Sequence, residues 1–286
     1  EAVDSDSSNY INKGLGYPSM KRSNEQFKNL YSKITESTIS PSLKTFSSSL
    51  GRATNFEQKL GFHPNFQHLK HTPDTEEHYI VSAFIDIKGS TNMFKKFDKE
   101  TVFLITNALL KAGIHTSLIF GGYVHRLQGD GMFVYFGGKS ISKKDAVLSA
   151  MQAISVYTYF VKNDLKEYLQ SKGIDNISIR SGVDLGYDKD VLWGNCGIGE
   201  ISEITTCSLH TSLASKMQAS ALANGVVAGQ YIKDELIEDE YFTPVCHRTD
   251  KTENDRYIYR IDDRNFYYTQ YDFKWEKFLK KQRAQS

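Results

Sequence analysis

The stretch "YIVSAFIDIKGST", residues 79–91, poses the first question about the fold. Its apolar run over 79–87 is typical of a buried strand. That strand ends with a carboxylate, Asp86, and the chain then breaks at Gly89 before two hydroxyl residues. A single Asp after a strand is often a helix cap. The surrounding pattern has to decide whether Asp86 is a cap or has a chemical role.

The segments that follow predict alternating helices and strands. Residues 99–120 have the pattern of a helix. The segment "GGYVHRLQGDGMFVYFGG" (121–138) predicts two short strands around a tight Gly-Asp-Gly turn, which indicates a hairpin. The amphipathic segment 142–173 predicts a long helix that stops at Gly173.

The remaining pattern completes one sheet. Further strands are expected at 177–186, 190–195, 225–229 and 256–262, with helices at 208–222 and 273–282. The order β-α-β-β-α-β-β-α-β places helices between strands of a single mixed sheet. We therefore expect an α+β fold with a ferredoxin-like, palm-type core and helices packed on one face of the sheet.

Three regions follow from composition. Residues 1–75 are expected to form an N-terminal tail and helical extension: 1–20 disordered, 23–50 helical, and 51–75 a linker with turn signals. Residues 76–235 hold the main α+β domain. Residues 236–286 are expected to add a strand and a helix that pack on this core, and the Tyr-rich "YRIDDRNFYYTQYDF" to cover a sheet edge or a dimer partner.

The charge balance narrows the class of protein. With 35 basic and 34 acidic residues the net charge is +1, which does not favour nonspecific binding to nucleic acid or membrane. No apolar run approaches about 18 residues, so no transmembrane helix is expected, and the start lacks the apolar stretch of a signal peptide. Three cysteines without a CxxC pair predict free thiols in a reducing cytosol. We expect a cytoplasmic protein.

A second carboxylate, Asp130, lies in the hairpin turn between two glycines. Its strands neighbour the strand of Asp86 in a palm-type sheet, so both carboxylates should meet at one edge. Two like charges become favourable there when divalent cations, Mg²⁺ or Mn²⁺, lie between them. Two such metals can activate an attacking oxygen and neutralise a leaving phosphate. Exposed amides of Ile87, Lys88 and Gly89 could bind phosphate oxygens. The alternative is that the Asp-Gly pair is only a turn.

Four segments now carry a family resemblance: "FIDIKGST", "HRLQGDGMFVYF", "IRSGVDLGYDKDVLWGNCG" and "SLASKM". Over about residues 78–230 the chain resembles class III nucleotide cyclase catalytic domains. Those dimeric enzymes build each active site from both subunits and convert a nucleoside triphosphate to a 3′,5′-cyclic monophosphate and pyrophosphate. The resemblance implies that Asp86 and Asp130 hold two metals, assisted by the carbonyl of Ile87. It places substrate binding at Lys88, Gly89, Ser90 and Thr91.

The departures from the family pattern concern the base and the transition state. The adenine-reading Lys, four residues before the second metal Asp, is Arg126 here, and its usual Asp partner aligns with Thr205. The ribose-orienting Asn aligns with Ser212. The transition-state Arg aligns with Lys216, which would act as a point charge without the planar fork of Arg, or be only a solvated helix residue.

Arg126 changes the hydrogen-bond code of the expected base site, because Arg offers only donors. The 6-amino group of adenine needs an acceptor, whereas uracil presents two carbonyl oxygens. Cytosine would require the hydroxyl of Thr205 to accept. This predicts UTP as the preferred substrate, then CTP, then ATP. The alternative is that Arg126 forms a salt bridge elsewhere and does not touch a base.

This base site and the "DIKGST" segment resemble the pyrimidine cyclases of Pycsar bacterial anti-phage systems, in which a separate effector responds to cyclic UMP or CMP. The leading hypothesis is a homodimeric uridylate or cytidylate cyclase with no nucleic-acid or membrane partner. The alternatives are a class III adenylate or guanylate cyclase and a catalytically inactive nucleotide-binding module. A palm-type polymerase or diguanylate cyclase is disfavoured, since "QGDGMF" is not a GGDEF-like turn.

Other residues are expected to be structural. Strand alternation predicts that His125 and Arg126 cannot face the same side. Arg180 and Asp184 share one face of a strand and are interpreted as structural or interfacial. Four aromatic residues are expected in the core: Trp193, Tyr157, Tyr159 and Phe160.

Overall fold

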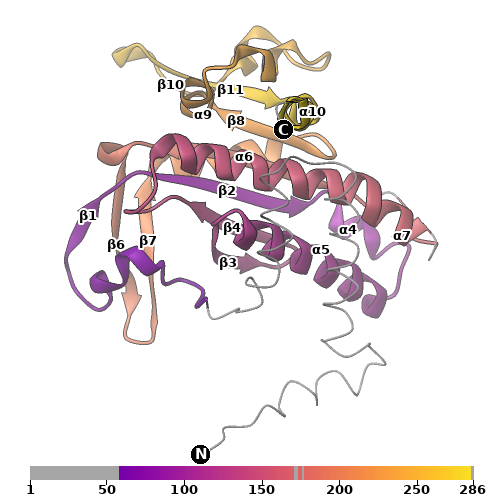
Figure 1. Ribbon diagram of the computed structural model, residues 1–286, viewed down its shortest axis with the longest axis horizontal. Coiled ribbons are helices and arrows are strands. Elements are labelled where there is room, and N and C mark those ends of the chain that lie inside the picture. The colour runs from indigo at the N-terminus through magenta and orange to yellow at the C-terminus, as the bar shows by residue number, and fades with distance from the viewer. Residues whose placement is uncertain (1–57, 171–172, 176, 285–286) are drawn as a thin grey trace, which may run out of the picture.

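The computed structural model describes residues 58–170, 173–175 and 177–284 (Figure 1). The disorder expected for 1–20 and the helix expected for 23–50 lie outside these residues. The division at residues 75 and 235 stays a prediction.

The centre of the molecule is a βαββαβ unit. Its elements are β2 (Ile80–Ile87), α5 (Lys99–Ile119), β3 (Tyr123–Gln128), β4 (Gly131–Phe136), α6 (Lys143–Phe160) and β5 (Ile179–Gly186). The strand order is β5-β2-β4-β3, and every neighbouring pair is antiparallel. This is the ferredoxin-like order, so the predicted α+β palm-type core is confirmed.

The C-terminal part extends this sheet. Strand β8 (Gly225–Gly229) runs parallel to β5, and β11 (Phe266–Phe273) then pairs with β8. The Tyr-rich segment thus covers the edge of β8, as β10 (Tyr257–Ile261) and β11. The sequence analysis missed three elements here: β9 (Phe242–Pro244), α9 (Gln230–Leu236) and β11. The C-terminal helix α10 (Trp275–Ala284) is where it was expected.

A separate three-stranded sheet lies beside the main one. It consists of β1 (Thr75–Glu77), β6 (Val191–Ile198) and β7 (Ile201–Ser208). Strand β6 was predicted, but β7 was not. Figure 1 shows the β6–β7 hairpin projecting from the body of the protein. At its tip the side chains of Ile198 and Ile201 are 86% and 89% exposed.

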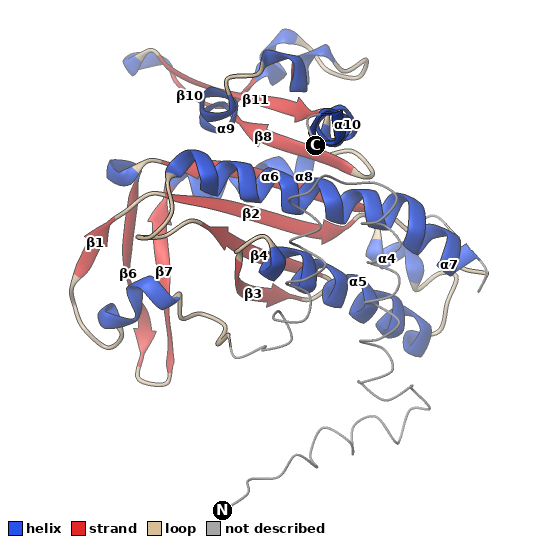
Figure 2. Cartoon of the chain, viewed as in Figure 1, coloured by secondary structure: helices blue, strands red, loops and turns tan. Residues whose placement is uncertain are grey.

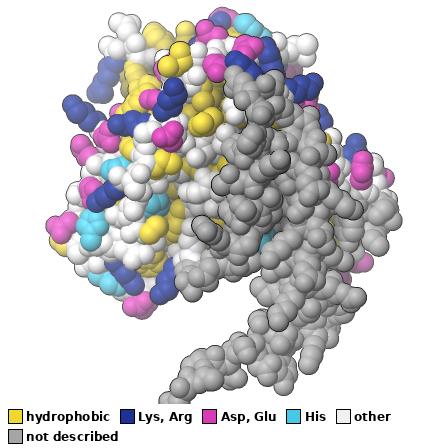
Figure 3. Space-filling model, in the orientation of Figure 1, with side chains coloured by type: hydrophobic (Ala, Val, Ile, Leu, Met, Phe, Trp, Pro, Cys, Tyr) yellow, Lys and Arg dark blue, Asp and Glu magenta, His cyan; other side chains and the backbone are white. Residues whose placement is uncertain are grey.

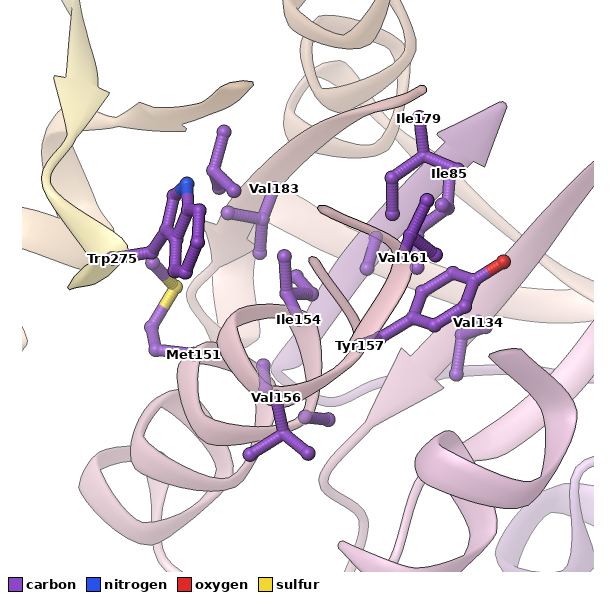
Figure 4. Packing of buried hydrophobic residues seen from close by; sticks show 14 of the residues in the cluster. Ile85, Val134, Met151, Ile154, Val156, Tyr157, Val161, Ile179, Val183 and Trp275 are labelled. Carbon is purple, nitrogen blue, oxygen red and sulfur yellow. The ribbon is translucent and has the colours of Figure 1, made fainter. Parts of the chain in front are cut away.

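Helices cover both faces of the main sheet. Side chains of α6, including Ile154 and Tyr157, pack with Val134, Ile85 and Val183 from the strands (Figure 4). Helix α8 (Leu209–Ser220) lies behind β2 in the view of Figure 2. There the hydroxyl oxygens of Thr211 and Ser82 are 2.9 Å apart.

The expectation of helices on one face is therefore wrong. A continuous apolar strand such as β2 is buried on both sides, and its sequence does not show which helix covers which side.

The long helix predicted for 142–173 is present, but a π-helical segment interrupts its α-helical geometry. It consists of α6, a π-helical turn (Val161–Leu165) and α7 (Lys166–Gln170). Gly173 has φ of +74° and its amide donates to the carbonyl of Gln170. This is the glycine stop that the sequence predicted.

The segment after residue 57 packs against the rest of the protein and is not a linker. The 3₁₀ helix Pro64–Leu69 buries Phe66, whose ring stacks on Trp193 with centroids 4.0 Å apart. The linker interpretation is wrong for the described residues of 51–75, because Phe66 and Leu69 of this helix are buried in a hydrophobic cluster. Other short 3₁₀ turns are Asp188–Asp190, Asp239–Tyr241, Val245–His247, Glu253–Arg256 and Asp262–Arg264.

The expected core aromatics are confirmed. Trp193 and Phe160 are fully buried, Tyr157 is buried, and Tyr159 is half-buried against the core. Cys196, Cys207 and Cys246 are free thiols.

Within the part of the chain that the structure describes, α5 alone is long and apolar enough to span a membrane. Its Ile105 and Leu109 are buried against the core, as in the core helix of a globular domain.

Candidate active site

The two carboxylates lie side by side. Asp86 is the last residue but one of β2, and Asp130 occupies the turn between β3 and β4. Ile85 pairs with Met132, which sets Asp86 opposite Gly131. A Cβ atom on Gly131 would lie 2.9 Å from the carbonyl oxygen of Ile85 and 3.3 Å from Oδ1 of Asp86. Glycine is therefore required for the turn to approach the end of β2 so closely.

The electrostatics of this pair suit a cation. Burial raises the pKa of Asp86 above its usual value; Arg180 opposes this shift and the nearby charge of Asp130 adds to it. Oδ2 of Asp130 is buried and has no hydrogen-bond partner among the described residues. A buried carboxylate oxygen without a partner, next to a second carboxylate, is costly unless a positive charge satisfies it.

The donor set fits a hard divalent cation. Asp86, Asp130 and the carbonyl of Ile87 offer only oxygen, which Mg²⁺ and Mn²⁺ prefer. The described residues contain no cluster of three or more His, Cys, Asp or Glu side chains. Water or substrate oxygens would therefore complete the coordination. The metal role of these three residues stays a prediction.

Arg180 and Gln218 also contact Asp86. Arg180, on β5, donates to Oδ2 of Asp86 from Nη2 at 2.8 Å and from Nε at 3.2 Å. Gln218, on α8, donates to the same oxygen at 3.2 Å. From the sequence, Arg180 was interpreted as structural or interfacial, and Gln218 had no predicted role. The cross-strand pair Asp86↔Arg180 becomes visible only when the register of β2 and β5 is known.

The turn after β2 is partly used by the fold itself. The amide of Lys88 donates to the carbonyl of Ser178 at 2.9 Å, and its Nζ to the carbonyl of Ala221 at 3.1 Å. The prediction of a phosphate-binding amide at Lys88 is therefore wrong, since this amide continues the β2–β5 pairing. Gly89 has φ of +74° and leads into the single-turn helix α4 (Ser90–Met93). Gly89 and Thr91 are exposed and Ser90 is half-buried.

A second group of predicted residues lines an open groove of about 670 Å³. Thr205 on β7 and Ser212 on α8 both lie in its wall. The hydroxyl oxygen of Thr205 is 3.5 Å from that of Tyr135, and Ser212 donates to the carbonyl of Ser208 at 3.2 Å. Lys216 is exposed one turn further along α8. The lining includes neither Asp86 nor Asp130 and no residue of the 88–91 turn.

Arg126 forms an ion pair with a residue that the sequence analysis missed. Its Nε donates to Oε2 of Glu203 at 3.0 Å, and its Nη2 donates to Oε1. Glu203 precedes Thr205 by two positions on β7, so both side chains face the same side of the strand. The alternative that Arg126 forms a salt bridge is thus what the structure shows. Recognition of β7 as a strand would have pointed to Glu203.

His125 and Arg126 approach the same carboxylate. Nε2 of the buried His125 is 3.7 Å from Oε2 of Glu203. The pairing of β3 with β4 shifts between Val124 and Arg126, which indicates a β-bulge. The prediction that the two side chains must face opposite sides is wrong, because a bulge interrupts the alternation of a strand.

Comparisons with known proteins agree with this geometry. No family model matches the chain. By structure, it is similar to the adenylyl cyclase CyaB from P. aeruginosa, with a TM-score of 0.56 and 20% identity over 70% of this chain and 95% of that one. The guanylyl cyclase Cya2 gives a TM-score of 0.55 with 16% identity, over 70% and 92%. The chain has the class III nucleotide cyclase fold.

The class III resemblance inferred from the four motifs is therefore confirmed, and curated relatives add to it. A cytidylate cyclase from Staphylococcus aureus is 36% identical over 225 residues, which are 78% of this chain and 53% of that protein. A cytidylate cyclase from Escherichia coli is 34% identical over 215 residues, 73% of this chain and 46% of that protein. The chain spans about half the length of these relatives.

Proposed function

We propose that the protein is a nucleotide cyclase that converts CTP to 3′,5′-cyclic CMP and pyrophosphate. The observation that carries this proposal is the adjacent pair Asp86 and Asp130, with its unpartnered buried oxygen, in a class III cyclase fold. The names of the curated relatives support cytidine rather than uridine. The predicted UTP preference assumed that no strong hydrogen-bond acceptor lies beside Arg126. The carboxylate of Glu203 is such an acceptor, so this assumption does not hold.

The reaction needs positioning and charge more than covalent help. The ribose 3′-oxygen loses its proton to solvent and bonds to the α-phosphorus, while the bond from that phosphorus to the departing pyrophosphate breaks. Asp86, Asp130 and the Ile87 carbonyl would hold divalent cations, which would neutralise the charge of the triphosphate and acidify the 3′-hydroxyl.

The surrounding side chains prepare this site. Nε and Nη2 of Arg180 donate to Asp86 and fix its orientation, while Nη1 donates to the carbonyl of Ala219 at 3.1 Å. We propose that Lys216 adds positive charge to the pentavalent phosphorus and that Ser212 orients the ribose.

We further propose that the active unit is a homodimer with shared sites. The carboxylates lie in one group and the groove with Thr205 and Ser212 in another, so each site would combine the carboxylates of one copy with the groove of the other. The exposed Ile198 and Ile201 at the tip of the β6–β7 hairpin are apolar surface suited to a partner copy.

The cellular role is proposed from the Pycsar resemblance: an anti-phage signal made in the cytoplasm and received by a separate effector. On the visible coloured part of the face in Figure 3, basic and acidic side chains are intermixed. With a net charge of +1, this agrees with a protein that does not use nucleic acid or membrane as a partner.

The test is turnover of each of ATP, GTP, CTP and UTP with Mn²⁺, with products identified by mass spectrometry. We expect cyclic CMP as the main product, and a loss of at least about 100-fold in Asp86→Asn and Asp130→Asn. Asp74→Asn, at an exposed position before β1, is the matched control and should keep full activity. Cyclic AMP or GMP as the main product would refute the base assignment. No product from any triphosphate would indicate a binding module.

A further inference from the structure

The Arg126–Glu203 pair lies outside the groove lining but next to it along the β6–β7 ladder. Glu203 is directly opposite Cys196 in the β6–β7 ladder, and Thr205 is opposite Gly194. Cys196, Gly194 and Thr205 all line the groove, so the carboxylate of Glu203 continues the same face. We propose that Glu203, held by Arg126, selects cytosine over uracil; this inference rests on the proposed cyclase function.

The pair presents a hydrogen-bond pattern that complements cytosine. Along its pairing edge cytosine has a 4-amino donor, then two acceptors, N3 and O2. A Glu carboxylate accepts from the amino group, as it does when it reads cytosine in DNA. Arg has five N–H donors, and Glu203 engages one on Nε and one on Nη2. Three donors remain for N3 and O2.

Uracil does not complement the hydrogen-bonding groups of the same pair. Its O4 carbonyl would face the carboxylate, with acceptor against acceptor, and its N3–H would face an Arg donor. Although burial opposes it, the hydrogen bond from Arg126 holds the pKa of Glu203 below its usual value. The carboxylate therefore stays ionised at neutral pH and cannot donate to O4. This mismatch disfavours uracil, because hydrogen-bonding groups of the base and of the pair would stay unpaired.

The local fold explains why Glu203 rather than Thr205 would perform this role. The bulge in β3 turns Arg126 toward β7 beside the buried His125. The hydroxyl of Thr205 lies beside the Tyr135 hydroxyl, which also contacts Thr206 at 2.9 Å. Thr205 thus lies within a network of hydroxyl groups, while Glu203 brings a full charge to the strand face beside the groove, with its side chain 21% exposed.

The experiment compares kcat/KM for CTP and UTP in Glu203→Gln, using the full chain with Mn²⁺. Gln keeps the size of Glu, but its amide can also donate to O4 of uracil. We expect the CTP-to-UTP ratio to fall at least about tenfold, with loss on CTP and no loss on UTP. Glu200→Gln, in the exposed turn of the same hairpin, is the matched control and should leave the ratio unchanged.

A second variant distinguishes the charge of residue 203 from its size. Glu203→Asp retains an ionised acceptor, so its ratio should lie between those of the wild-type protein and Glu203→Gln. An unchanged ratio in Glu203→Gln, or a lower ratio in Glu203→Asp than in Glu203→Gln, would overturn the inference.

Failure of the proposed function is visible separately. If the wild-type protein binds CTP without turnover, the cyclase proposal fails, and the ratio of the CTP and UTP dissociation constants in the same variants decides the role of Glu203. A wild-type protein that binds neither nucleotide would overturn both.

Discussion

Asp86 and Asp130 bring two negative charges close together, and without a metal this proximity destabilises the fold. The proximity of Asp130 and the burial of Asp86 raise the pKa of Asp86, so the folded protein holds this proton more tightly than the unfolded chain does. The stability linked to this group is complete below the pKa of the unfolded chain. It is lost as the pH rises through the raised folded value.

Asp130→Asn removes one of these charges. We expect the metal-free variant to melt at a higher temperature than the wild-type protein at pH 7, measured with a chelator present. Addition of Mn²⁺ should raise the melting temperature of the wild-type protein and not that of the variant. A variant that melts lower without metal would mean that Asp130 stabilises the fold rather than the site.

At the residue scale, the sequence predicted the meeting of Asp86 and Asp130, because a hairpin turn and a strand end are local features. It did not predict Arg180, Gln218 or Glu203. Their roles depend on strand register and on the face that a helix covers, and neither quantity has a local signal.

At the scale of elements, the β3 bulge and the Pro64–Leu69 helix build an aromatic cluster that contains two buried histidines. His63 lies 5.3 Å from the Trp193 ring and His125 lies 4.9 Å from the Tyr135 ring, measured between centroids. Burial lowers the pKa of His63 to about 3 and that of His125 to about 4. Both rings are therefore neutral in the folded protein at pH 7.

The sign of the resulting pH dependence follows from these shifts. The stability linked to each histidine is present above the unfolded pKa of about 6.5 and is lost as the pH falls toward the folded value. Urea unfolding between pH 7 and 5 should show a loss of about 1.4 kcal/mol per pH unit for each histidine below that pKa.

His125→Phe tests which residue is responsible. Neither ring nitrogen of His125 has a hydrogen-bond partner among the described residues, so an apolar ring of similar shape should reduce this slope. His71→Asn, at an exposed position, should not change it. An equal slope in His125→Phe would refute the assignment.

Elements with a clear periodicity of apolar residues were predicted well, including α5, α6, α8 and the β3–β4 hairpin. Strand β7 was missed because "ISEITTCS" has a weak apolar alternation, and its pairing with β6 stabilises it instead. The bulge in β3 has no signal in the sequence, yet it directs Arg126 toward Glu203.

At the scale of the whole molecule, the account requires two copies. Thr205 and Ser212 line the groove of one chain, and neither Asp86 nor Asp130 belongs to that lining. The proposed homodimer would bring the carboxylates of one chain to the groove of the other through its symmetry.

The most direct measurement is cyclic CMP formation by a mixture of two inactive variants, Asp86→Asn and Lys216→Ala, after their chains have exchanged. The mixed dimer contains one site with both groups intact, so about a quarter of the wild-type activity should return. A mixture of Asp86→Asn and Asp130→Asn, which damage the same group, should stay inactive. Restored cyclic CMP in the first mixture alone is the predicted result. No activity in that mixture, with exchange verified, would contradict the account.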